Sequence, residues 1–201
     1  MQKTNCNIGS VNQMKDKLLQ KHIQSIVELT EEEFLLVKKH FVYEKYQKNE
    51  IIFSEGEKVK NVYFVLSGLL KLVYTDENVK QHIISFAMED WWETDFQAYY
   101  TKSNASFSLV CLEDTQVFCL SLEDFENLCN SLQKMERFFL RKSIAGHIGS
   151  ERRILSFLTS GAKARYEQLI IQNPSLLQRI SKLQLASYLG VSRETLSRLF
   201  F

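Results

Sequence analysis

The sequence predicts an α+β protein with an N-terminal antiparallel β-barrel of jelly-roll type, a long helix, and a C-terminal helix-turn-helix domain. Seven short segments rich in β-branched and aromatic residues lie between positions 41 and 122. Apolar residues spaced alternately by three and four follow them, which is typical of a helix. Two short helical segments that meet at a glycine follow near the C-terminus.

The N-terminal part is predicted to be helical and then to change to strands. Thr30 and Glu33 have the spacing of a capping box, which predicts a helix start before an apolar run. From Phe41 onward, short apolar segments alternate with turn signals at 55–57, 67–68 and 76–78. Short strands at this spacing indicate an antiparallel sandwich or barrel over residues 1–121, the expected sensor domain.

The helix predicted from Leu122 carries an apolar seam over two heptads. Two interpretations stay open for this seam: a two-stranded dimer contact, or a helix that packs on its own barrel. We take the dimer contact as the leading interpretation. The seam residues are Phe125, Leu128, Leu132, Met135 and Phe139.

A break is expected after this helix. Gly146 and Gly149 weaken a helix locally, and Ser150 has the chemistry of an N-cap for a new one. We therefore predict a dimerisation helix and hinge over 122–149, and a DNA-binding domain over 150–201.

The last twenty residues have the pattern of a helix-turn-helix. Small Ala186 permits close helix approach, and Gly190 accepts the backbone of the turn. The helix after the turn would present its N-terminal residues to the major groove, where arginine bonds guanine and glutamate accepts from cytosine. Serine and threonine there can reach phosphates. The predicted DNA-binding residues of this helix are Ser192, Arg193, Glu194, Thr195 and Arg198.

Charge and composition narrow the functional class. Residues 1–120 carry 13 basic and 17 acidic side chains, whereas residues 121–201 carry 12 basic and 7 acidic ones. The net positive charge of the second part favours the binding of a polyanion. The N-terminal segment lacks the apolar core of a signal peptide, and no apolar run is long enough to cross a membrane. We expect a cytoplasmic protein that does not bind membranes. The four scattered cysteines indicate reduced thiols and no metal site.

A β-rich first half, a long apolar helix and the motif "GVSRETLSR" (190–198) resemble the CRP/FNR superfamily of bacterial transcription regulators. The resemblance covers residues from about 20 to 201 and is most specific in that motif. It implies a cyclic-nucleotide-binding-like sensor, a winged helix-turn-helix domain and a homodimer on double-stranded DNA, with RNA polymerase as a candidate partner. It also implies that Arg193, Glu194 and Arg198 read bases and that Lys182 contacts phosphate.

The sensor half departs from the nucleotide-binding members of that family. The resemblance places Glu93 and Ser106 at effector-binding positions, but Trp92 stands in place of a glycine and Ala105 in place of an arginine. Lys102 would supply only a point charge to a cyclic phosphate. We therefore expect an unknown effector other than cyclic AMP. The same loop carries an aromatic cluster that could line a ligand pocket or simply pack on the barrel: Trp91, Trp92, Phe96, Tyr99 and Tyr100.

The leading hypothesis is a sequence-specific DNA-binding transcription regulator that acts as a homodimer. The alternative is a small-molecule sensor whose C-terminal domain makes protein contacts only. We expect no enzyme, because no nucleophile–base pair, metal-ligand spacing or phosphate-binding glycine loop is present, and no cofactor, because the four histidines are isolated.

Overall fold

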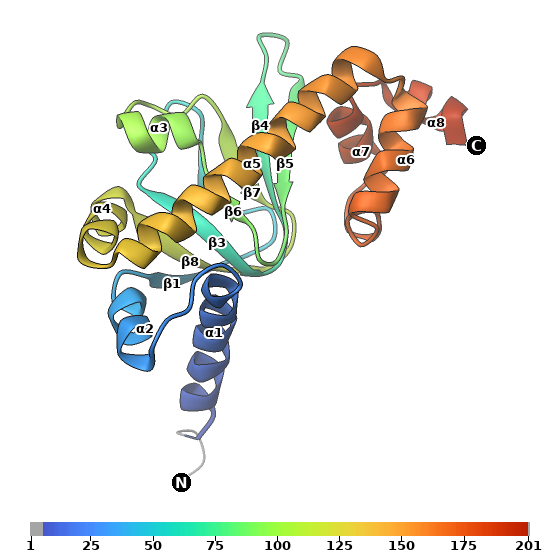
Figure 1. Ribbon diagram of the computed structural model, residues 1–201. Helices are drawn as coiled ribbons and strands as arrows, with labels where there is room; N and C mark the ends of the chain where they lie inside the picture. The colour runs from blue at the N-terminus through green and yellow to red at the C-terminus, as the bar shows by residue number, and fades with distance from the viewer. Residues whose placement is uncertain (1–5, 201) are drawn as a thin grey trace, which may run out of the picture.

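The computed structural model describes residues 6–200, and the side chains of residues 13–198. Two antiparallel sheets form the centre, the long helix α5 crosses them, and α6–α8 gather at one end (Figure 1). The helices and strands are α1 (Cys6–Gln24), α2 (Glu31–Lys38), β1 (Val42–Tyr46), β2 (Ile51–Phe53), β3 (Asn61–Ser67), β4 (Leu70–Thr75), β5 (Gln81–Ala87), β6 (Trp92–Glu93), α3 (Phe96–Thr101), β7 (Ser108–Cys111), β8 (Thr115–Ser121), α4 (Leu122–Ser131), α5 (Gln133–Thr159), α6 (Ala162–Gln172), a short 3-10 helix η1 (Leu176–Gln178), α7 (Lys182–Leu189) and α8 (Arg193–Phe200).

The predicted helical start is confirmed in α1 and α2. Thr30 caps α2, and its side chain and that of Glu33 form the reciprocal capping box. The box satisfies two N–H groups that a helix start otherwise leaves unpaired.

The strands form two open sheets and not the closed barrel that the sequence predicts. One sheet has the order β1–β8–β3–β6 and the other the order β2–β7–β4–β5. Every strand pair is antiparallel. Strand lengths and turns read from a sequence do not show which edges meet, so a sandwich and a barrel have the same local signature. We call residues 42–121 the β-module.

The main core lies between the two sheets and under α1, α2, α4 and α5. Strand β3 is buried along nearly its whole length and reads as a continuous apolar run. Phe64, Phe138 and Ile23 bring strand, helix α5 and helix α1 into one cluster. The N-terminal helices therefore belong to the same hydrophobic core as the β-module.

The long helix differs from the prediction at both ends. It is broken at Leu132, whose backbone is extended, so α4 and α5 are separate helices. It then continues without interruption through 146–150, where a break was expected, because a glycine lowers helix stability by only about 1 kcal/mol and does not by itself end a helix. The division into domains at 121 and 149 stays a prediction.

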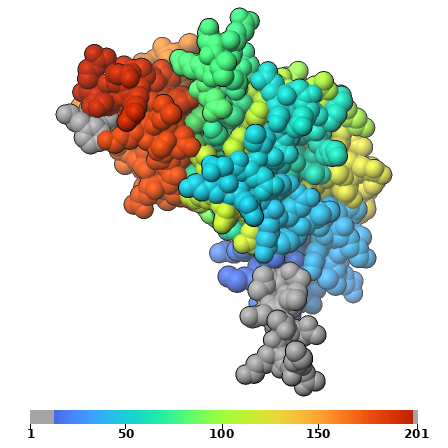
Figure 2. Space-filling view, turned by 180° about the vertical axis from the view of Figure 1, so that it is seen from behind, coloured from blue at the N-terminus to red at the C-terminus, as the bar shows by residue number. Residues whose placement is uncertain are grey.

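The C-terminal helices share a second hydrophobic cluster with the β-module. Ile83 and Phe86 of β5 lie in it together with Leu176, Ala186 and Leu189. Seen from behind, the C-terminal helices contact the β-module directly, with the β4–β5 hairpin projecting beside them (Figure 2). Between residues 122 and 200 the described chain is helical and contains no strand, so the wing implied by the resemblance is absent from this part. No helix among the described residues is long and apolar enough to cross a membrane.

Candidate nucleic-acid interface

Helix α7 begins and ends at the residues that the sequence indicates. Ser181 caps its start in a capping box with Gln184. Gly190 ends it in a left-handed conformation with φ of 69°, and the N–H of Val191 returns to the carbonyl of Ala186 at 3.0 Å. This bond closes the helix, and the left-handed glycine turns the chain sharply. We call residues 182–200 the α7–α8 unit.

The turn at Gly190 is packed as well as left-handed. A Cβ atom on Gly190 would lie 2.7 Å from the ring of Phe157 in α5. Arg165 of α6 donates to the carbonyl of Leu189 at 2.9 Å, and its guanidinium lies 4.7 Å from the centroid of the Phe157 ring. The positive charge of Arg165 also interacts favourably with the C-terminal end of α7, which is the negative end of the helix dipole. The turn is therefore held by two preceding helices.

Helix α8 presents a polar face to solvent. The hydroxyl of Ser192 accepts from the N–H of Thr195 at 3.1 Å and so caps the helix start. Arg193, Glu194 and Arg198 are exposed, whereas Leu196 is buried in the second cluster. A hydrogen bond from its own backbone N–H and one from Ser192 hold the pKa of Glu194 below its usual range, so it is ionised at neutral pH.

The six predicted DNA-binding residues lie in or beside the α7–α8 unit. Lys182 is the first residue of α7 and is exposed, and the other five lie between Ser192 and Arg198. The described face carries Arg193 and Glu194 in the first turn of α8 and Arg198 in its last turn, a set of side chains that suits the edges of bases in a groove. Among the described residues, no group of histidine, cysteine, aspartate and glutamate side chains could hold a metal ion.

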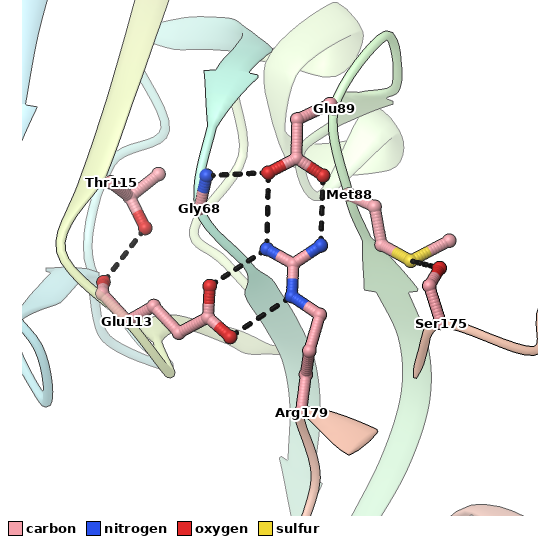
Figure 3. A network of polar contacts seen from close by, with 7 residues as sticks. All are labelled: Gly68, Met88, Glu89, Glu113, Thr115, Ser175 and Arg179. Carbon is pink, nitrogen blue, oxygen red and sulfur yellow. Dashed lines mark hydrogen bonds and ion pairs between the residues drawn. The ribbon is translucent and has the colours of Figure 1, made fainter. Parts of the chain in front are cut away.

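Three arginines that fix this unit were not identified from the sequence. Arg165 holds the turn, and Arg153 of α5 donates to the carbonyls of Tyr188 at 3.0 Å and Ile83 at 3.3 Å. Arg179 pairs with Glu89 and Glu113 of the β-module (Figure 3). Their partners are backbone carbonyls or carboxylates distant in sequence, so no local pattern reveals them.

The two predicted effector residues of the β-module lie in different environments. Glu93 is buried, and Ser85 and the backbone N–H of Thr94 donate to its carboxyl group. Burial raises the pKa of Glu93 to about 7. Ser106 is exposed, and its N–H donates at 2.8 Å to Asp95, which also caps α3. Asp95 was not predicted, although an aspartate before a helical run is a recognisable cap.

The aromatic residues near Glu93 do not form one cluster. Trp92 points into the core against Phe64 and Phe139, and its indole N–H donates to His22 at 2.9 Å. Tyr99 is buried, whereas Trp91, Phe96 and Tyr100 are about half exposed. Of the two readings of this cluster, the described side chains support packing on the β-module.

The predicted dimer seam faces the chain's own core. Leu128 and Met135 have no exposed surface, Phe139 is buried, and Phe125 and Leu132 pack against the same cluster. This corrects the leading interpretation of the seam in favour of the helix packing on its own β-module. Spacing shows that one face of a helix is apolar but not whether the same chain or a second one covers it.

A different face of α5 is apolar and uncovered. Leu140, Ile144 and Ile148 recur every four residues and are 58%, 47% and 40% exposed. Leu155 continues the same side of the helix two turns later. We call these four residues the α5 stripe.

The comparisons with known proteins agree with this architecture. Residues 43–131 match the cyclic nucleotide-binding domain family. The transcriptional regulatory protein Btr of Bordetella pertussis is 25% identical over 77% of this chain and 67% of its own length. The regulatory protein HlyX of Actinobacillus pleuropneumoniae is 22% identical over 98% of this chain and 84% of its own.

The chain is similar to CRP/FNR-type transcription regulators. The catabolite activator protein of Thermus thermophilus superposes with a TM-score of 0.55 over 85% of this chain and 82% of its own, at 25% identity. FixK2 of Bradyrhizobium japonicum has the same fold, with a TM-score of 0.69 over 79% of this chain and 82% of its own, at 17% identity. These relatives are regulatory proteins and not enzymes.

Proposed function

We propose that this chain is a sequence-specific DNA-binding transcription regulator of the CRP/FNR type that acts as a homodimer. The exposed polar face of α8 supports the proposal most directly. Its arginines and glutamate point to solvent, while Leu196 and the turn at Gly190 anchor the helix from behind. A face used for protein contact alone would be richer in apolar side chains.

The proposed contacts follow from the chemistry of the side chains. Arg193 reads a guanine through two parallel hydrogen bonds, and Glu194 accepts from the amino group of a cytosine. Lys182, at the start of the preceding helix, contacts a phosphate. Ser192 and Thr195 lie at the start of α8, and Arg198 lies one turn further along the same helix.

The α5 stripe is our proposal for the dimer contact. Four apolar side chains on one helix face would be costly to leave in water, and two copies that pack this face bury them. Two-fold symmetry then sets the two copies of α8 against equivalent half-sites.

The effector is proposed to be a compound other than cyclic AMP. Ala105 is buried and supplies no cation for a cyclic phosphate. Glu93 already accepts hydrogen bonds from its own chain, and Trp92 lies in the core beside it. Added cyclic AMP should therefore leave DNA binding unchanged.

The test is a binding series on every single-base variant of a selected site, at several salt concentrations. Arg193→Ala should flatten the preference at one base pair per half-site, worth about 1–3 kcal/mol, because a bidentate pair discriminates by that amount. Lys182→Ala should weaken binding to all sequences alike and reduce the salt slope by about 1 per protomer. Half-sites should lie about 10 base pairs apart.

Arg152→Ala is the matched control, because Arg152 is an exposed arginine of α5. It should leave the base preferences unchanged. Intact base preferences in Arg193→Ala would show that α8 does not read the groove. Failure of the unaltered protein to bind any duplex would favour the alternative, a C-terminal domain that contacts proteins.

A further inference from the structure

Arg179 fastens the C-terminal helices to the β-module. It lies directly after η1 and three residues before Lys182, the first residue of α7. Its guanidinium points at two carboxylates from different loops of the β-module, Glu89 after β5 and Glu113 between β7 and β8 (Figure 3). We call these three residues the Arg179 latch.

Both carboxylates of the latch are bidentate. Arg179 donates to Glu113 through Nε at 2.9 Å and Nη2 at 2.7 Å. It donates to Glu89 through Nη1 at 2.8 Å and Nη2 at 3.1 Å. The backbone N–H of Gly68 also donates to Glu89 at 2.9 Å, which fixes that carboxylate in place. These contacts raise the pKa of Arg179 above its already high value, so the cation is permanent.

The latch acts together with contacts along β5, the edge strand of its sheet. The hydroxyl of Ser187 donates to the carbonyl of Gln81 at 2.8 Å and accepts from the N–H of Ile83 at 3.1 Å. The ring of Tyr188 lies 5.0 Å from that of Phe86. Helix α7 is therefore docked on the β-module while the polar face of α8 remains exposed.

A carboxylate and a DNA phosphate can occupy the same edge of a guanidinium. Each is anionic, and each offers two oxygens that accept two parallel N–H groups. The latch is accessible to water: the exposed fractions of the side chains are 21% for Arg179, 43% for Glu89 and 34% for Glu113. Water that reaches these side chains screens the ion pairs and so lowers the cost of opening them.

We propose that Glu89 and Glu113 are an internal substitute for a DNA phosphate, and that Arg179 exchanges them for the phosphate backbone when the α7–α8 unit binds DNA. The inference rests on the proposed function, because it assigns a further phosphate contact to the same unit. While Arg179 is paired with these carboxylates, one cation per protomer is not available to DNA, and the affinity of the protein for DNA is lower. A change in the β-module that separates the two carboxylates would release Arg179.

The position of Arg179 supports this exchange. The first helix of a helix-turn-helix crosses the DNA backbone, and Arg179 lies just before that helix in the same segment as Lys182. The β-module also adds negative charge beside the unit, since residues 42–121 carry 12 acidic and 7 basic side chains. Loss of the two carboxylates therefore removes competition for Arg179.

The experiment compares duplex binding of the unaltered protein with that of E89Q/E113Q across salt concentrations. Glutamine keeps an acceptor for Gly68 but loses the charge that holds Arg179. E89Q/E113Q should bind about 5-fold tighter near ~0.1 M salt, with a salt slope steeper by about 1 per protomer. The matched control is E123Q/E126Q, which removes the same charge from α4, away from the latch, and should change affinity less than about 2-fold.

The variant R179Q tests whether the gain in DNA affinity depends on Arg179. Added to E89Q/E113Q, it should abolish the gain in affinity and return the salt slope to that of the unaltered protein or below. A gain that survives R179Q would reflect general repulsion, and equal affinity of E89Q/E113Q and the control would also overturn the exchange. The single variant E113Q should show a smaller gain of the same sign, which keeps the test open if the double variant folds poorly.

The two proposals fail in different ways. An unaltered protein that binds no duplex at any salt concentration overturns the proposed function, and the exchange with it. A protein that binds duplex with the base preferences assigned to Arg193, but shows no gain in E89Q/E113Q, overturns the exchange alone.

Discussion

Single residues decide how the start of helix α8 is held. Gly190 is left-handed and has no room for a side chain, Arg165 binds the carbonyl before it, and Phe157 fills the space behind it. Each belongs to a different element, so the turn depends on residues from three parts of the chain. A change at Gly190 therefore affects conformation and packing together.

The first prediction concerns a pair of glycines. Gly190→Ala should destabilise the chain by about 1–3 kcal/mol, because the left-handed backbone disfavours a side chain and the new Cβ meets Phe157. Gly149→Ala is the matched control: it lies inside α5 with no atom within 4 Å of the added Cβ, and it should stabilise by about 0.5–1 kcal/mol. Urea unfolding of both variants checks the signs. Equal effects would show that the turn at Gly190 does not constrain the fold.

At the scale of elements, α5 has two apolar faces with different roles. Met135, Phe138 and Phe139 pack into the core of the same chain. The α5 stripe lies on another side and remains exposed. Burial, and not spacing, distinguishes the face that stabilises the chain from the face that remains exposed to solvent.

The second prediction tests that distinction. Ile144→Glu should convert dimers into monomers in sedimentation experiments, because a charge buried in a packed helix pair is unfavourable. The unfolding free energy of the monomer should change by less than about 0.5 kcal/mol, since Ile144 is exposed in the single chain. Ser143→Glu adds the same charge one residue away, outside the stripe, and should leave the dimer intact. Dimers in Ile144→Glu would place the contact on another surface.

At the scale of the whole molecule, two buried titratable groups connect α1, the β-module and α5. His22 lies among Phe64, Trp92 and Phe138, and burial and the charge of Lys142 lower its pKa to about 4. Burial raises the pKa of Glu93, the residue after Trp92, to about 7. Their effects on stability as a function of pH have opposite signs.

The third prediction follows from those signs. His22 titrates at about 6.5 when unfolded, so its contribution is present above pH 6.5 and is lost as the pH falls through about 4. Glu93 titrates at about 4.5 when unfolded, so its contribution is present below pH 4.5 and is lost as the pH rises through about 7. The two should largely cancel between pH 4.5 and 6.5 in the unaltered protein.

Neutral variants should reveal each contribution separately. Relative to the unaltered protein, the unfolding free energy of His22→Gln should fall as the pH rises over this window, and that of Glu93→Gln should rise. Across the window, the changes in unfolding free energy of the two variants should differ by several kcal/mol, because a tenfold change in an acid dissociation constant is worth about 1.4 kcal/mol. Urea unfolding at several pH values between 4.5 and 6.5 checks this. Parallel curves for the two variants would contradict the burial of both groups.

The sequence by itself determined the local structure. The capping box at Thr30, the strand segments and the turn at Gly190 all appear where composition and spacing predict them. Hydrogen bonds to neighbouring backbone and the conformations allowed to glycine cause these features, and both act over a few residues. The same locality makes the polar face of α8 visible in the motif at 190–198.

Only the tertiary structure decided which surfaces meet. The seam from Phe125 to Phe139 packs on its own chain, the sheets remain open, and α5 continues through Gly146 and Gly149. The Arg179 latch joins residues that are 66 and 90 positions apart. Periodicity shows that a helix face is apolar or that a side chain is charged. The partner of that face or charge depends on the path of the whole chain, because burial and ion pairing are set by distances in space and not along the sequence.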